Sequence, residues 1–107
     1  MSPARVALLC PDLMFGSKVE GALRAAGHEV TVGLSAGADA VVVDLTEESI
    51  DTDSVPGDAG GVPTIGFYPH VDVDTRRRAL EAGYDVVVPR SKMARETVAI
   101  VEGALRR

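Results

Sequence analysis

The stretch Ala-Val-Val-Val-Asp at residues 40–44 is a short run of β-branched side chains that ends in a carboxylate. β-Branched residues so close together favour a strand over a helix. Comparable segments occur at residues 5–10, 29–32, 64–68 and 85–89. Most of them are apolar at nearly every position, which is typical of strands that are covered on both faces. The sequence therefore predicts five strands in a common interior.

Helical signals separate these strands. They consist of apolar side chains at helical spacing, a capping residue before the first turn, or a glycine after the last turn. The predicted helices are residues 13–26, with Ser-Lys-Val-Glu at 17–20 matching a capping box; residues 76–82, capped by Asp72 or Asp74 and ended by Gly83; and residues 91–104, capped by Ser91. A further short helix is expected at residues 46–51, because a structureless segment over 45–61 would be long for a small domain.

Strands that alternate with helices predict a parallel sheet between two helical layers. Right-handed crossovers leave few topologies for such a sheet. We therefore expect a single domain over residues 1–107 with a three-layer, flavodoxin-like α/β fold and a five-stranded sheet in the order 2-1-3-4-5.

Composition excludes several classes of protein. The chain has 16 acidic and 11 basic residues and a net charge of -5, which argues against broad nucleic-acid binding. No apolar run approaches the roughly 18 residues that span a bilayer, and no secretion signal is recognisable, so we expect a cytoplasmic protein without a membrane partner. Cys10 has no second cysteine to pair with, and only two histidines occur, which excludes a disulfide framework and a structural zinc site.

The charge is unevenly distributed along the chain. Residues 25–75 contain ten acidic residues and no Lys or Arg, whereas residues 76–107 contain eight basic and four acidic residues. The sequence therefore predicts an electrically two-sided molecule. Its basic part is expected to bind an acidic protein surface, such as the acidic middle of a second copy, with an affinity that falls as salt rises.

Functional residues of an open parallel sheet gather beyond the carboxyl ends of the strands. Asp44 directly ends a valine-rich strand, so its carboxylate is expected to face this crevice. Asp12, Tyr68, His70 and Arg90 follow other predicted strands and are expected around it. The alternatives are that Asp44 is a solvated strand end or starts a turn, and that Asp12 is a helix cap.

The C-terminal half carries a more specific pattern. Val-Pro at 62–63 precedes one strand, Arg-Arg-Arg-Ala-Leu-Glu-Ala-Gly-Tyr-Asp at 76–85 leads into the next, and Arg-Ser follows at 90–91. This pattern resembles the receiver domains of two-component response regulators, and the resemblance extends over most of the chain. It implies that Asp44 stands at the position of the phosphoacceptor aspartate. It also implies that Arg90 replaces the lysine that contacts the phosphoryl group.

Four positions depart from the receiver pattern. Receivers end their first strand with an acidic pair that holds Mg²⁺, and Cys10 and Pro11 stand there, with Asp12 one step later. Tyr68 replaces a Thr or Ser that hydrogen-bonds the phosphoryl group, and Val87 replaces an aromatic residue. The chain is also shorter than a receiver on both sides of its third strand, which implies that the second helix is missing and the third is shortened.

These departures favour a stand-alone pseudo-receiver, which is a regulatory protein-interaction module without enzymatic activity, cofactor or Mg²⁺-dependent phosphotransfer. Arginine offers a planar fork where lysine offers a point charge, so Arg90 is expected to bridge Asp44 permanently. Receivers commonly dimerise through the fourth helix, fifth strand and fifth helix. The resemblance therefore implies a homodimer through residues 72–107.

Two alternatives remain open. The first is a functional receiver that is phosphorylated on Asp44 and uses Asp12 as a metal ligand, since Mg²⁺ can bind through one or two carboxylates. The second is a flavodoxin-like protein that binds flavin or another small ligand. This alternative has the weakest motif support, because the glycines at 57–61 lead into a strand and not into a helix N-terminus.

Overall fold

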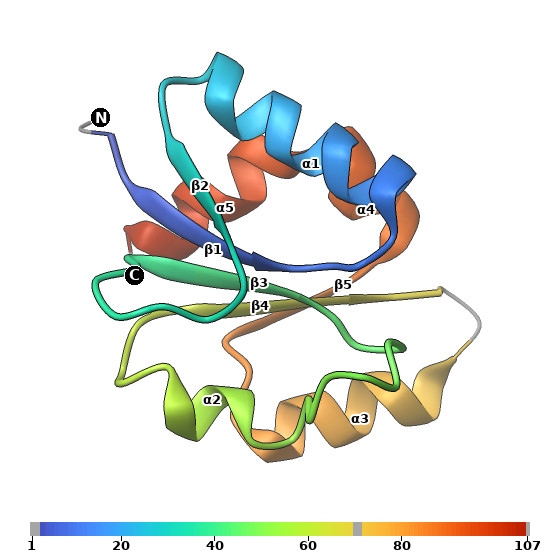
Figure 1. Ribbon diagram of the computed structural model, residues 1–107. Helices are drawn as coiled ribbons and strands as arrows, with labels where there is room; N and C mark the ends of the chain where they lie inside the picture. Colours follow the sequence, from blue (N-terminus) through green and yellow to red (C-terminus); the bar gives the residue numbers. More distant parts are fainter. Residues whose placement is uncertain (1–2, 70–71, 107) are drawn as a thin grey trace.

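Five parallel strands form one sheet through the middle of the protein (Figure 1). The computed structural model describes residues 3–69 and 72–106, so the candidate residue His70 lies outside the described residues. The strands are β1 (Arg5–Leu9), β2 (Glu29–Val32), β3 (Ala40–Asp44), β4 (Thr64–Tyr68) and β5 (Val86–Pro89). Their order is β2-β1-β3-β4-β5, and every neighbouring pair is parallel. The predicted topology is confirmed.

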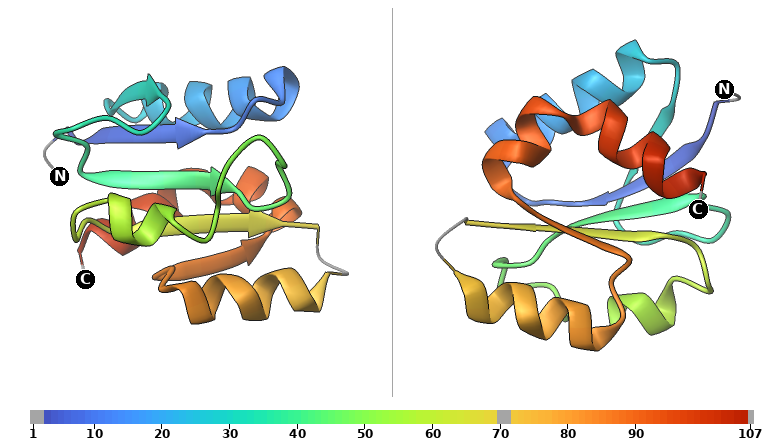
Figure 2. Two further views of the ribbon diagram at one scale, coloured as in Figure 1. Left: turned by 60° about the horizontal axis from the view of Figure 1, so that its bottom comes forward. Right: turned by 180° about the vertical axis from the view of Figure 1, so that it is seen from behind.

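Helices cover both faces of this sheet (Figures 1 and 2). One face, called the α1 face below, carries α1 (Leu13–Ala25), α4 (Arg90–Arg95) and α5 (Thr97–Leu105); the other, the α3 face, carries α2 (Val55–Asp58) and α3 (Val73–Ala82). All residues of β3 and β4 are buried, because these central strands are packed on both sides. The three-layer architecture is therefore confirmed.

Side chains alternate between two buried clusters along each strand. Val42 and Phe67 belong to the cluster on the α1 face, whereas Val43 and Tyr68 belong to the cluster on the α3 face. Asp44 follows Val43 and pairs in register with Phe67, so its side chain belongs to the α1 face. This alternation decides which strand-end residues can meet.

The two crossovers around β3 contain little helix. Residues 33–39, all of which are described, contain turns and no helix. The crossover from β3 to β4 holds only the four-residue helix α2. Both features agree with the expectation that the second helix is missing and the third is shortened.

The position predicted for the short helix was wrong. Residues 46–51 form turns, and α2 begins only after Ser54. The turns are favoured by local side-chain hydrogen bonds: the Asp44 carboxylate accepts from the Thr46 amide, and the Glu47 carboxylate accepts from the Ser49 amide and hydroxyl.

Two predicted helix caps were wrong, whereas the alternative that Asp12 is a helix cap is confirmed. α1 is capped by Asp12, whose carboxylate accepts from the amides of Met14 and Phe15 at 3.0 and 3.1 Å, and not by the proposed capping box at 17–20. The last helix starts at Arg90 after Pro89, so Ser91 does not cap it, and it breaks at Glu96 into α4 and α5.

The helix over the basic segment was predicted correctly at both ends. Asp72 caps α3 by accepting from the Thr75 amide, and Gly83 ends it with a left-handed φ of 109°. Within residues 3–69 and 72–106, no helix is long and apolar enough to cross a bilayer.

Candidate functional site

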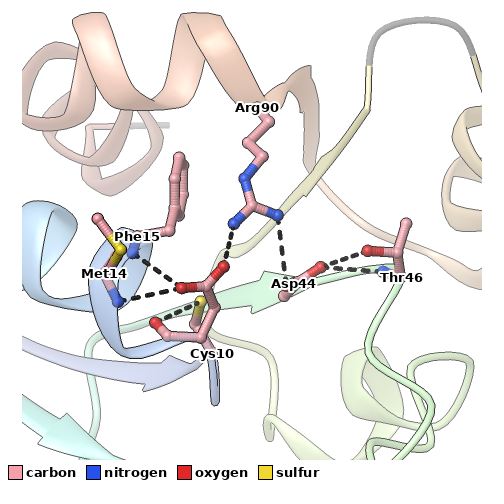
Figure 3. A network of polar contacts seen from close by, with 7 residues as sticks. Cys10, Met14, Phe15, Asp44, Thr46 and Arg90 are labelled. Carbon is pink, nitrogen blue, oxygen red and sulfur yellow. Dashed lines mark hydrogen bonds and ion pairs between the residues drawn. The ribbon is translucent and has the colours of Figure 1, made fainter.

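Asp12, Asp44 and Arg90 meet beyond the carboxyl ends of the strands (Figure 3). Arg90 donates from Nη2 to Oδ2 of Asp12 at 2.6 Å, and its Nη1 lies 3.9 Å from Oδ2 of Asp44. The expected pairing of Arg90 with Asp44 is therefore present. Asp12 completes it, so that one guanidinium faces two carboxylates from β3 and from the start of α1.

The carboxylate of Asp44 is almost wholly enclosed, since the residue is 4% exposed. Its Oδ1 accepts from the amide of Thr46 at 3.0 Å and from the hydroxyl of Thr46 at 2.8 Å, while Oδ2 faces Arg90. Both oxygens therefore have partners within the protein. The alternative interpretation of Asp44 as a turn-starting aspartate is also confirmed, because its hydrogen bonds with Thr46 stabilise the turn after β3.

Arg90 is held by aromatic rings as well as by charge. Its guanidinium carbon lies 4.3 Å from the centroid of the Phe15 ring and 5.9 Å from that of Phe67. The two rings are themselves 4.8 Å apart. A cation over an aromatic face is attracted by the ring quadrupole. The stacked ring therefore helps to hold both the position and the plane of the Arg90 guanidinium.

The electrostatics of the site keep Asp12 ionised and Cys10 neutral. The hydrogen bond from the Phe15 amide, with help from Arg90, lowers the pKa of the Asp12 carboxyl. Burial and, secondarily, the nearby Asp44 carboxylate raise the pKa of the Cys10 thiol. A protonated thiol is a poor nucleophile, so Cys10 is placed as a structural residue at the end of β1.

A guanidinium, and not a third acidic side chain, accompanies the two carboxylates at this edge. Among the residues that the structure describes, no group of three or more His, Cys, Asp or Glu side chains is arranged to share a metal. Asp12 and Asp44 are the two nearby carboxylates, and the guanidinium of Arg90 faces both (Figure 3). Mg²⁺ prefers oxygen ligands in octahedral geometry, and here one oxygen of each carboxylate faces a nitrogen of the Arg90 guanidinium.

Tyr68 does not join this cluster. It is buried and belongs to the cluster on the α3 face that includes Leu45, Ala79 and Tyr84. The expectation that it lines the crevice is corrected by strand alternation, since Phe67 is the residue of β4 that faces Arg90.

Two participants in the site, Phe15 and Thr46, were not predicted from the sequence. Thr46 had a local signal, because a side chain two positions after a strand-end aspartate commonly closes a turn with it. Phe15 had none, because its contact with Arg90 depends on the path of α1 across the edge of the sheet.

Comparison with known proteins identifies solved structures that share this architecture. No protein-family model and no curated protein matches the chain. Solved structures do: the CheY-like receiver domain protein of Methanospirillum hungatei superposes with a TM-score of 0.81 at 15% identity and covers 98% of this chain and 95% of its own. The receiver domain of Francisella response regulator 1452 gives 0.81 at 14% identity, with 97% and 98% coverage.

NtrX from Brucella abortus superposes with a TM-score of 0.83 at 16% identity over 98% of this chain. The matched part is 27% of the NtrX chain, so this protein spans about a quarter of that relative. The fold is therefore that of response regulator receiver domains, as the resemblance in the sequence implied.

Proposed function

We propose that the protein is a pseudo-receiver, a regulatory protein-interaction module in the cytoplasm that uses the receiver fold without Mg²⁺-dependent phosphoryl transfer and without enzymatic activity. One observation carries the proposal. The guanidinium of Arg90 faces the carboxylates of both Asp12 and Asp44 while it stacks on Phe15.

This arrangement opposes attack by Asp44 on a phosphoryl donor. Phosphoryl transfer depends almost wholly on positioning and on charge stabilisation, because the donor and the attacking carboxylate are both anionic. Asp44 Oδ1 already accepts two hydrogen bonds from Thr46, and Oδ2 is directed at Arg90. An attacking oxygen would have to leave these partners inside a site that is nearly closed to solvent.

The same arrangement opposes metal binding. A divalent cation would have to displace Arg90 or bind beside its positive charge, and like charges at close range repel. Arg90 is bound through the planar fork of its guanidinium and through the Phe15 ring, and a lysine ammonium at this position would have no equivalent to the fork. We therefore assign to Arg90 the charge-neutralising role that a metal ion would otherwise have.

The competing function, a receiver phosphorylated on Asp44 with Asp12 as metal ligand, has one observation in its favour. The two carboxylates face the same guanidinium through its two terminal nitrogens, so both would be available to a metal ion if Arg90 swung away. A titration with Mg²⁺, followed by the backbone amide signals of residues 12 and 44–46, separates the two functions. We expect no saturable shift in the wild type and a saturable shift in Arg90→Ala. Saturable binding to the wild type would favour the functional receiver.

Output from a pseudo-receiver passes through contact with another protein. We assign this contact to residues 72–107, where α3 and α4 carry most of the basic side chains of the chain. Arg76, Arg77, Lys92 and Arg95 are exposed on these elements. The partner is accordingly an acidic protein surface, in a homodimer or in a complex with another protein, and neither nucleic acid nor a membrane.

A further inference from the structure

An apolar groove lies on the α3 face, where a turn-rich crossover stands in place of a helix. Its volume is about 560 Å³, and it runs between the crossover from β2 to β3 and the segment that follows α2. Leu34 forms part of its rim, while Val41, Ala59 and Val62 supply further apolar lining. Asp58 is exposed at the same groove. The groove therefore offers apolar surface with an acidic edge.

The outer side of α3 carries the opposite combination. Val73 and Leu80 are 70% and 44% exposed and lie seven residues apart, so they share one stripe of the helix. Arg76 and Arg77 are exposed between them, whereas Ala79 faces the sheet. This stripe presents two apolar anchors and two guanidinium groups, of which that of Arg77 also pairs with Asp74 in the first turn of α3 at 3.3 Å.

The charges of the two surfaces are complementary. Residues 25–75, which contain the groove, have no Lys or Arg, and α3 contains three arginines in a row. Arg5 is the basic side chain beside Gly37 of the groove, and it already pairs with Glu29 at 3.4 Å. An acidic apolar groove and a basic apolar helix stripe thus occur on one molecule.

Both surfaces also lie on the same side of the sheet. The left view of Figure 2 looks onto this side and shows α3, α2 and the crossover from β2 to β3 together. When two complementary surfaces lie on one side of a molecule, two copies related by a two-fold axis can place the helix of each copy against the groove of the other. Both contacts are then used, and the assembly closes at two copies. A head-to-tail chain would satisfy only one contact per neighbour.

We propose that the occupant of the groove is α3 of a second copy of this chain, in a symmetric pair in which each α3 lies along the groove of its partner. This proposal rests on the proposed function as an interaction module and names its partner. Val73 and Leu80 supply the apolar contact, and Arg76 and Arg77 face the acidic edge at Asp58.

Sedimentation equilibrium at low ionic strength tests the pair. The wild type is expected to be a dimer whose dissociation constant rises with salt, and Leu80→Asp or Leu34→Asp is expected to weaken it by about tenfold or more. The matched control is the double variant Leu13→Asp, Met14→Asp, because these residues are 83% and 87% exposed on α1, on the other side of the sheet. The control should dimerise as the wild type does.

A charge swap makes the test specific for this interface. Arg76→Glu with Arg77→Glu gives a chain whose helix and groove are both acidic, and Asp58→Arg gives a chain with a basic edge at the groove. Each is expected to be monomeric alone, and an equimolar mixture is expected to form a heterodimer. A monomeric wild type, a dimer that the control disrupts, or a mixture that stays monomeric would overturn the proposal. None of these results affects the Mg²⁺ titration, so the proposed function is judged separately.

Discussion

Arg90 joins three elements through one side chain. It belongs to the first turn of α4, bonds the carboxylate that caps α1, and faces the carboxylate that ends β3. The ring of Phe15 lies beneath it at 4.3 Å. A residue with this many contacts is expected to stabilise the edge of the sheet, and under the proposed function it also keeps Asp44 from reacting.

Replacing Arg90 by alanine should lower the free energy of unfolding by about 1–3 kcal/mol, because a charged hydrogen bond is lost and Asp44 keeps its enclosed position without a facing cation. Arg90→Lys should recover only part of this loss, since a point charge cannot face both carboxylates as a fork does. Urea unfolding measures both. Arg95→Ala is the control: its pair with Glu96 is exposed, and its effect should stay within about 0.5 kcal/mol. Equal stability of all three variants would contradict this role of Arg90.

The pKa of Asp12 makes a second prediction at the same scale. Its folded-state pKa is lowered, so folding favours the ionised form. The stability that Asp12 contributes is therefore fully present above the ordinary carboxyl pKa of 3.8 and is lost as the pH falls through the lower folded value. Asp12→Asn can still cap α1 but carries no charge, and its stability should fall less over the same acidic range. Parallel acid-induced unfolding curves for the two proteins would count against a lowered pKa of Asp12, to which the Phe15 amide contributes most and Arg90 adds.

At the scale of elements, sequence patterns predicted whatever depended on local chemistry. β3 and β4 lie where their apolar runs placed them, and α3 begins after Asp72 and ends at Gly83 as its flanking residues indicated. The short helix was misplaced because turn hydrogen bonds after Asp44 compete with a helix at 46–51.

The candidate site was partly predictable for a related reason. Asp44, Asp12 and Arg90 follow strand ends, and parallel strand ends gather at one edge. Tyr68 was assigned to the wrong side although strand alternation gives the side directly once Phe67 is known to face the site. The position of Phe15 under Arg90 results from tertiary packing, which no local pattern encodes.

Gly66 in the middle of β4 provides a prediction for an element. A Cβ at this position would lie 2.7 to 2.9 Å from side-chain atoms of Leu45, which belongs to the buried cluster on the α3 face. Gly66→Ala should destabilise the fold by about 1–3 kcal/mol through overpacking. Gly21→Ala in α1 is the matched control, because a Cβ there meets nothing within 4 Å and alanine favours a helix by about 0.5–1 kcal/mol. Thermal unfolding should shift the two variants in opposite directions, and a neutral Gly66→Ala would contradict the close packing of Leu45.

At the scale of the whole molecule, the receiver fold carries features of its own. The crossover from β2 to β3 is a loop, a guanidinium faces two carboxylates at the carboxyl edge of the sheet, and the charge is divided between an acidic middle and a basic C-terminal third. His28 links the segment before β1 to α5: its ring accepts from the Ala4 amide at 3.1 Å and contacts Glu102 of α5 at 2.8 Å. A fold whose candidate site is nearly closed to solvent suits a protein that acts by binding another protein.

The most direct test of this account is intact-mass spectrometry after incubation with acetyl phosphate and Mg²⁺. Wild type, Asp44→Asn and an authentic receiver domain should be treated side by side, so that the receiver shows that the reagent is active. We predict that the wild type keeps its unmodified mass, as Asp44→Asn does, while the receiver gains a phosphoryl group. A phosphoryl adduct on the wild type that is absent from Asp44→Asn would contradict the claim that Arg90 has replaced the metal-dependent chemistry.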